Sequence, residues 1–189
     1  MRVIAGEFRS RVLQSLTGLD VRPTPDRLRE ALFNILAPRI RGSVFVDAYA
    51  GTGAVGIEAI SRGAKQAVFI ERNRQAIEAI QANLKSLGIK AAARIIKGPA
   101  ALHLASIHAD IVFLDPPYPL ETEYRTAMEV LAANPPSLVI AQHSVRYALP
   151  EQFDGLGRTR VVRQSDNALS FYAPVNVPDR QDQDPASSN

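Results

Sequence analysis

The chain has 189 residues, enough for one α/β domain with a sizeable core and a small extension. Its 46% hydrophobic and 22% charged residues are ordinary for a globular protein, and the lack of cysteine excludes disulfides, cysteine nucleophiles and thiolate zinc sites. No apolar run approaches the roughly 18 residues of a membrane span, and no signal-peptide pattern opens the chain. We therefore expect a cytoplasmic protein without a membrane partner.

The amino-terminal segment predicts a short basic hairpin. Two strand-like runs, residues 2–4 and 12–13, flank the polar residues 6–11. Most of the positive charge of the chain, whose formal net charge is +3, comes from arginine, and many of these arginines precede residue 42. Arginine matches the geometry of phosphate groups, which favours a polyanionic partner, although codon bias in a GC-rich genome would give the same composition.

A helix follows the hairpin. Thr24 can cap its amino end, Pro25 suits the first helical position, and Asp26 complements the helix dipole. Pro38 and Gly42 are expected to end it. Apolar residues recur at the spacing of one buried helix face, namely Leu28, Ala31, Leu32, Ile35 and Leu36.

From residue 43 onward, apolar runs alternate with helical patterns, which predicts a parallel sheet covered on both faces. The last two runs are joined by a polar turn and predict a terminal β-hairpin on this sheet. The expected strands are residues 44–46, 67–70, 93–96, 111–114, 138–141, 158–163 and 168–172. Helices are expected at residues 54–61 and, closed by Gly88, around the apolar face Ile77, Ile80, Leu84 and Leu87.

The loop between the first strand and its helix contains the pattern G-x-G-x-x-G at Gly51, Gly53 and Gly56. Alone, this pattern indicates a dinucleotide site, with Glu71 at a suitable distance for a ribose hydroxyl. Asp47, however, ends the strand where a pyrophosphate would rest, and its carboxylate would repel that group. The same carboxylate would attract the ammonium and sulfonium of S-adenosylmethionine, which we therefore predict as the co-substrate.

Each part of the predicted donor site has an expected contact with the co-substrate. The glycines would let the backbone approach the methionine part closely, and the two oxygens of Glu71 would accept both ribose hydroxyls. The predicted donor-binding residues of this part of the chain are Asp47, Ala50, Gly51, Gly53 and Glu71, joined by Asp115 from a later loop.

The reacting site is predicted at the tetrapeptide Asp115-Pro116-Pro117-Tyr118, which follows the fourth strand. The prolines offer no N–H donors, which leaves the Asp115 carboxylate and the Pro116 carbonyl as acceptors beside an aromatic face. Two acceptors can hold the two N–H groups of an exocyclic amine and aim its lone pair at a methyl group, while Tyr118 stacks on the base. We predict Asp115, Pro116 and Tyr118 as catalytic residues.

Several functions remain open from these residues. The tetrapeptide fits a guanine amine, adenine N6 or a protein glutamine amide. A non-catalytic RNA-binding assembly factor could keep the same fold, whereas a nicotinamide-dependent oxidoreductase is disfavoured by Asp47 and the Asp-Pro-Pro-Tyr loop. The three histidines, His103, His108 and His143, lack metal-ligand spacing, so we expect no metal and place them on the surface or in loops.

Over residues 2–173 the chain resembles the RsmD-type 16S rRNA guanine-N2 methyltransferases of bacteria. The resemblance depends on a combination of motifs that is more specific than any one of them. These motifs are Arg22-Pro23-Thr24, Asp26 to Glu30, Leu32-Phe33-Asn34, Asp47 to Gly56, Glu58-Ala59, Ser61 to Ala64, Glu71, Asn83-Leu84, Asp115 to Tyr118 and Ala168 to Tyr172.

The resemblance implies a class I S-adenosylmethionine-dependent methyltransferase: a Rossmann-like, doubly wound α/β sheet of seven strands with the last strand antiparallel. It implies a monomer that methylates a guanine N2 of 16S rRNA in the 30S subunit or its assembly intermediate. Thr24 and Arg27 would help close the donor pocket, and the hairpin would contact RNA phosphates through Arg2, Arg9, Arg11 and Arg22. We expect an extension at residues 1–41, a methyltransferase domain at 42–175 and a disordered tail at 176–189.

Three positions depart from the family pattern. Gly98-Pro99-Ala100 stands where many such enzymes place a polar side chain toward the adenine, so that contact would come from the backbone. Gln142 replaces a commonly acidic residue after the fifth strand, and Ser165 replaces a glycine of the final hairpin. None of the three is expected to touch the predicted acceptor cluster of the reacting site.

Overall fold

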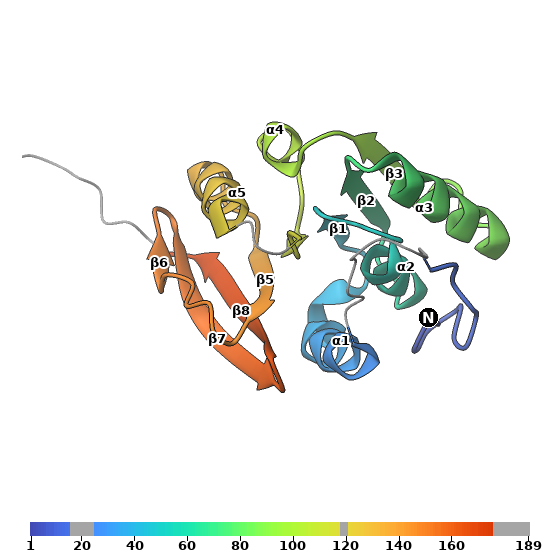
Figure 1. The fold of residues 1–189 in the computed structure, drawn as a ribbon, viewed down its shortest axis with the longest axis horizontal. Helices are drawn as coiled ribbons and strands as arrows, with labels where there is room; N and C mark the ends of the chain where they lie inside the picture. The colour runs from blue at the N-terminus through green and yellow to red at the C-terminus, as the bar shows by residue number, and fades with distance from the viewer. Residues whose placement is uncertain (16–24, 118–120, 176–189) are drawn as a thin grey trace, which may run out of the picture.

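The computed structural model describes residues 1–15, 25–117 and 121–175 (Figure 1). They form an α/β fold with one sheet whose eight strands lie in the order β3-β2-β1-β4-β5-β8-β7-β6. The strands are β1 (Val44–Asp47), β2 (Gln66–Glu71), β3 (Ala93–Lys97), β4 (Ile111–Leu114), β5 (Leu138–Ser144), β6 (Gln152–Phe153), β7 (Leu156–Gln164) and β8 (Asn167–Pro174). The helices are α1 (Asp26–Ile40), α2 (Ala54–Ser61), α3 (Arg74–Leu87), α4 (Ala100–Leu104) and α5 (Glu121–Ala133).

The sheet is parallel from β3 through β5 and antiparallel beyond. Its strand order reverses between β1 and β4, and open sheets of this kind bind ligands beyond the carboxyl ends of the strands at such a reversal. The terminal hairpin β7–β8 is antiparallel, as predicted, and β8 pairs with β5. The strand absent from the seven-strand prediction is β6, a two-residue edge strand.

Helices cover both faces of the sheet, with α4 and α5 on the side opposite α1 and α2 (Figure 1). Residues along β1 alternate between the two resulting cores: Phe45 lies in the cluster of α1, and Val46 lies in the cluster of α5. Asp47, the next residue, therefore faces the side of α1 and α2. By the same alternation after Phe113 and Leu114, Asp115 faces that side too.

The path of α1 brings its amino end to the ligand-binding edge. The helix ends at Ile40, and after the turn at residues 41–43 the chain enters β1 at the amino edge of the sheet. Since α1 packs on the sheet through Leu32 and Leu36, its amino end lies toward the opposite, carboxyl edge. Arg27, in the first turn of α1, is exposed there.

Two details of the predicted first helix were wrong. Pro25 is the N-cap residue rather than the first helical residue, and Pro38 lies inside the helix instead of ending it. The helix continues to Ile40 because that side chain is buried in the same cluster as Leu36, and this burial offsets the backbone hydrogen bond that Pro38 cannot make. Thr24, the predicted cap, lies outside the described residues.

The amino-terminal hairpin is present as predicted. Arg2 and Val12 form an antiparallel bridge, and the Val3 N–H donates to the Arg11 carbonyl at 3.0 Å. Val3 and Leu13 are buried in the cluster that also contains α2, α3 and β2. The hairpin and strands β6–β8 lie at opposite ends of the molecule (Figure 1).

A buried carboxylate anchors this hairpin. Glu58, on α2, is fully buried and accepts the Ile4 N–H at 2.8 Å and the Ala5 N–H at 3.0 Å. The same carboxylate accepts from the Arg62 Nε at 2.7 Å. Because the partners are backbone groups of the hairpin, Glu58 fixes its orientation on the domain.

Gly56 is required for the packing of α2 on β2. A Cβ atom at this position would lie 2.3 Å from the Phe69 Cε1. We expect Gly56→Ala to destabilise the protein by about 1–3 kcal/mol, measured by urea unfolding. The loss of stability caused by Gly56→Ala should be smaller in a Phe69→Leu background, where the ring is absent. An equal loss in both backgrounds would contradict a clash between residues 56 and 69.

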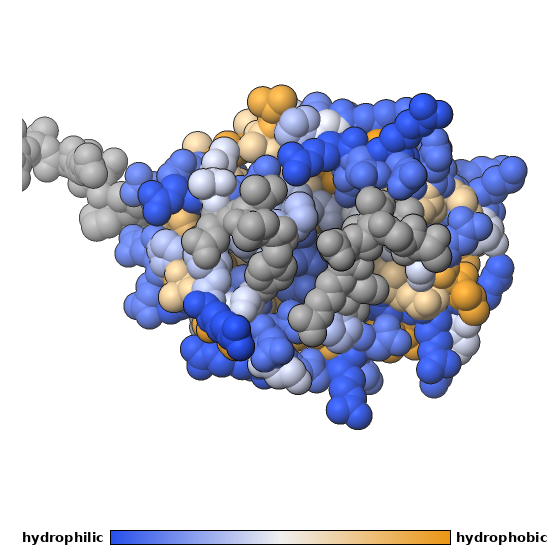
Figure 2. All heavy atoms as spheres, in the orientation of Figure 1, coloured by the Kyte–Doolittle hydropathy of each residue, from blue (hydrophilic) through white to orange (hydrophobic). Residues whose placement is uncertain are grey.

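Within the described ranges, no helix is long and apolar enough to cross a membrane. Figure 2 shows that the face of the molecule in this view is mostly hydrophilic. Apolar atoms gather in this view over α4, which carries the exposed Leu102, and toward the end that holds the amino-terminal hairpin, where Val12 is exposed.

Candidate active site

Three carboxylates occupy the carboxyl edge of the sheet at its point of reversal. Asp47 ends β1, Glu71 ends β2, and Asp115 follows β4 directly. Asp47 is in register with Phe69 of β2 and Phe113 of β4, so β1 places it between the other two acids. The structure therefore brings together the acidic residues predicted from the sequence.

The Asp47 carboxylate is buried beneath the glycine loop. Its Oδ2 accepts the Gly56 N–H at 2.9 Å, which satisfies a backbone group in the first turn of α2. Burial raises the pKa of Asp47 to about 7; the Glu71 charge acts in the same direction, and the Gly56 hydrogen bond opposes both. Asp47 thus stabilises the start of α2 by accepting the Gly56 N–H. A cation bound nearby would favour the ionised form of its carboxyl group.

The glycine loop takes its shape from backbone angles that favour glycine. Gly51 and Gly53 have φ values of 54° and 80°, in the left-handed region. Gly53 is the N-cap residue of α2, and its N–H donates to the Ala50 carbonyl at 2.7 Å. Ala50 in turn donates to the Ile70 carbonyl at 3.1 Å, which ties the loop to the end of β2.

Glu71 holds the other side of this loop. Its Oε2 accepts the Gly51 N–H at 2.8 Å, and its Oε1 accepts the N–H groups of Arg72 and Asn73, both at 2.8 Å. A carboxylate has about four acceptor positions, so one remains for a ligand hydroxyl. For Glu71 to accept both ribose hydroxyls, one backbone hydrogen bond would have to be released.

Asn83 is a positioning residue that the sequence reasoning did not assign. It is buried on α3, and its Nδ2 donates to the Thr52 carbonyl of the glycine loop at 3.0 Å. Its Oδ1 accepts the Gln14 N–H at 2.7 Å, at the start of the chain segment that leads to α1. The sequence feature that could have indicated this role is that Asn83 is a polar residue on the otherwise apolar helix face of Ile80 and Leu84.

The acceptor cluster at the fourth strand is tied to β5. Gln142 donates its Nε2 to the Asp115 Oδ2 at 3.0 Å, and the Gln142 side chain is buried. Gln142 was predicted to follow the fifth strand and not to touch the acceptor cluster, and both predictions were wrong. β5 runs to Ser144 and contains Gln142, and because β5 pairs with β4 its side chain reaches Asp115. Pro116 is buried beside Asp115, while Tyr118 lies outside the described residues.

The placement of His143 on the surface was wrong. This residue lies in the longer β5 and is buried, with its Nε2 2.8 Å from the Ser170 Oγ and its Nδ1 2.8 Å from the Ser144 carbonyl. Burial lowers the pKa of His143, so the neutral ring is favoured. Across the described residues, no group of three or more His, Asp or Glu side chains could hold a metal ion.

A second contact network lies at this edge on the side of α5. The Tyr49 hydroxyl donates to the Glu123 Oε2 at 3.0 Å, and the Arg72 Nη1 lies 3.6 Å from the Glu123 Oε1. Burial and the Glu123 charge raise the pKa of Tyr49, which keeps its hydroxyl protonated as a donor. The network joins the loop after β1 and the residue after Glu71 to the start of α5.

Comparison with known proteins assigns the family. The chain matches, over residues 1–173, the family described as Conserved hypothetical protein 95. The "Putative rRNA methyltransferase YlbH" of Bacillus subtilis is 34% identical over 180 residues, covering 91% of this chain and 98% of the relative. The chain belongs to this family. Its resemblance to the RsmD-type enzymes is confirmed.

Further relatives and solved structures support the same fold. The Ribosomal RNA small subunit methyltransferase D of Escherichia coli is 42% identical over 121 residues, a match that covers 62% of this chain and 60%, less than two thirds, of the relative. The structure of "Putative methyltransferase yhhF" from Escherichia coli has a TM-score of 0.79 at 30% identity, covering 92% of this chain and 97% of that chain. An RNA methyltransferase from Salinibacter ruber in complex with S-adenosyl-L-homocysteine shares the fold, at 17% identity, a TM-score of 0.62 and a coverage of 86% of this chain and all of that one.

In this member of the Conserved hypothetical protein 95 family, the predicted RNA contacts lie away from the acceptor cluster. Arg2, Arg9 and Arg11 are exposed on the hairpin, and the Arg11 Nη2 donates to the Ser86 carbonyl of α3 at 3.0 Å. The remaining predicted contact, Arg22, and the predicted donor contact Thr24 lie outside the described residues. The hairpin is therefore a fixed basic element at one end of the sheet.

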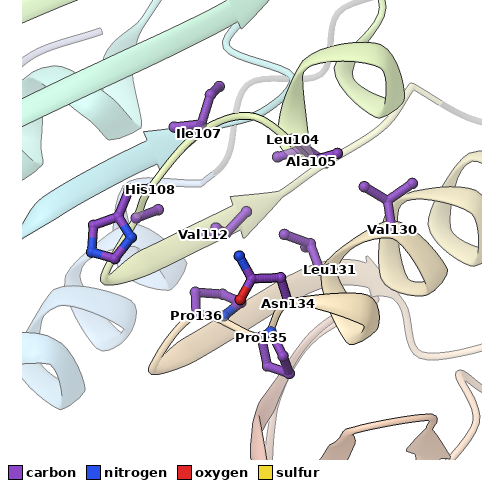
Figure 3. A pocket seen from close by; sticks show the side chains of 11 residues that line it. Leu104, Ala105, Ile107, His108, Val112, Val130, Leu131, Asn134, Pro135 and Pro136 are labelled. Carbon is purple, nitrogen blue, oxygen red and sulfur yellow. The ribbon is translucent and has the colours of Figure 1, made fainter.

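A small cleft elsewhere in this family member does not coincide with the site. Figure 3 shows it between α4, α5 and the start of β4, lined by apolar side chains that include Leu104, Val112 and Leu131. His108 and Pro136 lie in the loops that precede β4 and β5, so the cleft opens at the amino edge of the sheet. The chemistry-bearing residues all lie at the other edge.

Proposed function

We propose that this chain transfers the methyl group of S-adenosylmethionine to the exocyclic N2 of a guanine in 16S ribosomal RNA. The observation that carries the proposal is the Asp115 carboxylate beside Pro116, tied to β5 by the 3.0 Å hydrogen bond from Gln142, on the same edge as Asp47 and Glu71. The names of the relatives support ribosomal RNA as the substrate. A cytoplasmic monomer acting on the 30S subunit or its assembly intermediate is part of this proposal.

The residues of the donor side fit S-adenosylmethionine. The left-handed Gly51 and Gly53 leave the loop without side chains, Glu71 keeps one acceptor position for a ribose hydroxyl, and buried Asp47 supplies negative charge. When bound, the co-substrate supplies an electrophilic methyl group on a positively charged sulfur. Arg27, exposed in the first turn of α1, would close this side together with Thr24.

At the reacting amine, the described residues Asp115 and Pro116 would supply hydrogen-bond acceptors. The Asp115 carboxylate and the Pro116 carbonyl would each accept one N–H of the guanine N2, which holds its lone pair toward the methyl carbon. The N–C bond forms as the C–S bond breaks, and the bonding pair returns to sulfur, leaving a neutral thioether. The nitrogen then releases one proton, which Asp115 or water accepts.

The decisive experiment uses the purified full chain with labelled S-adenosylmethionine and, in parallel, naked small-subunit RNA and unmodified 30S particles. The RNA is digested, and its nucleosides are identified by mass. We expect labelled N2-methylguanosine, with the better substrate showing at which stage of assembly the chain acts. Labelled N6-methyladenosine would show that the methylated base is adenine and not guanine. Unlabelled RNA with intact donor binding would indicate that the substrate is a protein glutamine or that the chain is a non-catalytic assembly factor.

Donor affinity should depend on pH through Asp47. Because burial raises the pKa of this carboxyl to about 7, it is partly protonated at neutral pH in the free protein. A bound cation favours the ionised form, so binding lowers this pKa and releases a proton. We expect affinity to fall by roughly tenfold from pH 8 to pH 6, measured by calorimetry in buffers of different ionisation enthalpy. Asp47→Asn should bind more weakly without this dependence, and a wild-type affinity that is flat with pH would contradict the assignment.

The hairpin arginines should govern RNA affinity without setting the chemistry. Changing Arg9 and Arg11 together to alanine removes two exposed cations, so RNA binding should weaken and the slope of its salt dependence should decrease by up to about 2. Filter binding across a salt series measures this effect. Changing Arg74, which pairs with Glu78 at 2.9 Å, serves as a matched control, and equal effects would mean that the hairpin does not face the RNA.

A further inference from the structure

Gln142 carries a hydrogen-bond acceptor that the protein does not use. Its Oε1 is buried and has no partner within the described part of the chain, although its Nε2 donates to the Asp115 Oδ2 at 3.0 Å. A buried acceptor without a partner is unfavourable by about 1–3 kcal/mol, and such atoms in folded proteins call for an explanation. The position of this one, attached to the residue that holds the catalytic carboxylate, points to a ligand.

The orientation of the Gln142 amide is fixed by its neighbours. A carboxylate only accepts hydrogen bonds, so the amide must turn its nitrogen toward Asp115 and its oxygen away from it. The residue lies within β5 in register with Leu169 of β8, and its flanking residues Ala141 and His143 are buried. Oε1 is therefore a preformed acceptor and cannot exchange roles with the amide nitrogen while Asp115 is ionised.

Among planar amines, a second acceptor beside the amine-binding carboxylate suits guanine. In guanine the N2 amine lies between two ring nitrogens, the donor N1–H on one side and the acceptor N3 on the other, so a donor is available on one side of the amine. Next to the amine of adenine or cytosine is an unprotonated ring nitrogen, and next to a glutamine amide nitrogen is a carbonyl oxygen, all of which are acceptors. An acceptor oxygen held beside the amine would attract the N1–H of guanine. The same oxygen would repel the ring nitrogen of adenine or cytosine and the carbonyl oxygen of glutamine.

We propose that the Gln142 Oε1 accepts the guanine N1–H and thereby selects guanine over other amine-bearing bases. This inference rests on the proposed methyl transfer and adds the residue that reads the base. Asp115 and Pro116 hold the amine, whereas Gln142 reads the neighbouring ring position and at the same time orients Asp115.

The test uses RNA in which only the target nucleotide changes. Small-subunit RNA is assembled by splint ligation with guanosine or 2,6-diaminopurine riboside at the nucleotide mapped by mass, in the naked or particle form that is methylated. Both bases carry the 2-amine, but only guanosine carries N1–H. We expect the wild-type chain to prefer guanosine by about 10- to 100-fold in kcat/KM, and Gln142→Leu to reduce this preference to within about threefold.

Two further variants separate base reading from general damage. Gln142→Glu keeps an acceptor oxygen, so it should retain the preference while its pH profile shifts to higher pH, because two carboxylates then adjoin. Gln164→Leu removes another buried amide oxygen without a partner, on β7, and should leave the preference unchanged. Thermal unfolding and donor affinity verify that each variant is folded.

The outcomes distinguish this inference from the proposed function. If the wild-type chain forms no N2-methylguanosine on the natural RNA, the proposed function fails and Gln142 has no guanine to read. If it forms N2-methylguanosine but folded Gln142→Leu keeps the full preference for guanosine, the proposed function stands and the inference is overturned. A preference lost equally in Gln142→Leu and Gln164→Leu would also overturn it.

Discussion

Asp115→Ala is expected to abolish methyl transfer while weakening donor binding only slightly, because Asp115 is one of several predicted donor contacts and the others remain. The substitution removes one of the two proposed acceptors for the amine and the partner of the Gln142 Nε2, but Asp47, Glu71 and the glycine loop keep their contacts. Positioning of this kind contributes several orders of magnitude to a rate, so we expect a loss of at least about 10³-fold in kcat. Single-turnover assays with labelled donor measure it.

The control for Asp115→Ala is calorimetric titration with S-adenosylhomocysteine, which should give an affinity within a few-fold of the wild-type value. Asp115→Asn tests whether charge or shape matters, since its amide can accept only through one oxygen. If Asp115→Ala kept most of its activity at normal donor affinity, the amine would have to be held elsewhere, and the role given to this loop would be wrong.

Glu58→Ala is expected to lower the free energy of unfolding more than Gly56→Ala or Glu78→Ala. The side chain is fully buried, and its carboxylate accepts hydrogen bonds from the Ile4 and Ala5 N–H groups and from the Arg62 guanidinium. It also favours the charge of fully buried Arg29, whose pKa is lowered by burial. Removing one partner of a buried ion pair leaves unpaired charge, so we expect a loss of about 3–5 kcal/mol in urea unfolding.

A matched surface pair provides the control for Glu58→Ala. Glu78 pairs with Arg74 at 2.9 Å with the same i, i+4 geometry in reverse order, and both side chains are largely exposed. Glu78→Ala should therefore change stability by less than about 0.5 kcal/mol. Hydrogen exchange at Ile4 and Ala5 should accelerate only in Glu58→Ala; equal protection in both variants would show that the carboxylate does not anchor the hairpin.

Local sequence signals were sufficient for much of the fold and of the donor side. The bounds of α2 match the predicted residues 54–61, and the acids at the ends of β1 and β2 share an edge as parallel strands require. Gly53 has the left-handed backbone that favours glycine, whereas Gly56 is required because a Cβ atom there would clash with Phe69 of β2, a packing contact that the glycine pattern does not encode. The bounds of α2 and the backbone of Gly53 depend on residues close in sequence.

Features that depend on distant pairing could not be predicted. Gln142 reaches Asp115 only because β4 and β5 are neighbours and β5 extends to Ser144, whereas its apolar run ends at Ala141. His143 was misplaced for the same reason. The polar Asn83 contacts Gln14 across 69 residues of sequence, a relation that no periodicity within α3 encodes.

The place of β8 in the sheet has a consequence for how the protein is made. Of the eight described strands of this sheet, β8 is synthesised last, yet it lies between β5 and β7 and covers the edge of the strand that carries Gln142. Until β8 is synthesised, β5 presents unpaired backbone groups, and chains truncated before Asn167 keep that exposed edge. A chain truncated before Asn167 would therefore keep its donor loop but lack the strand that pairs with β5 beside Gln142, so we expect it to lose activity and to aggregate.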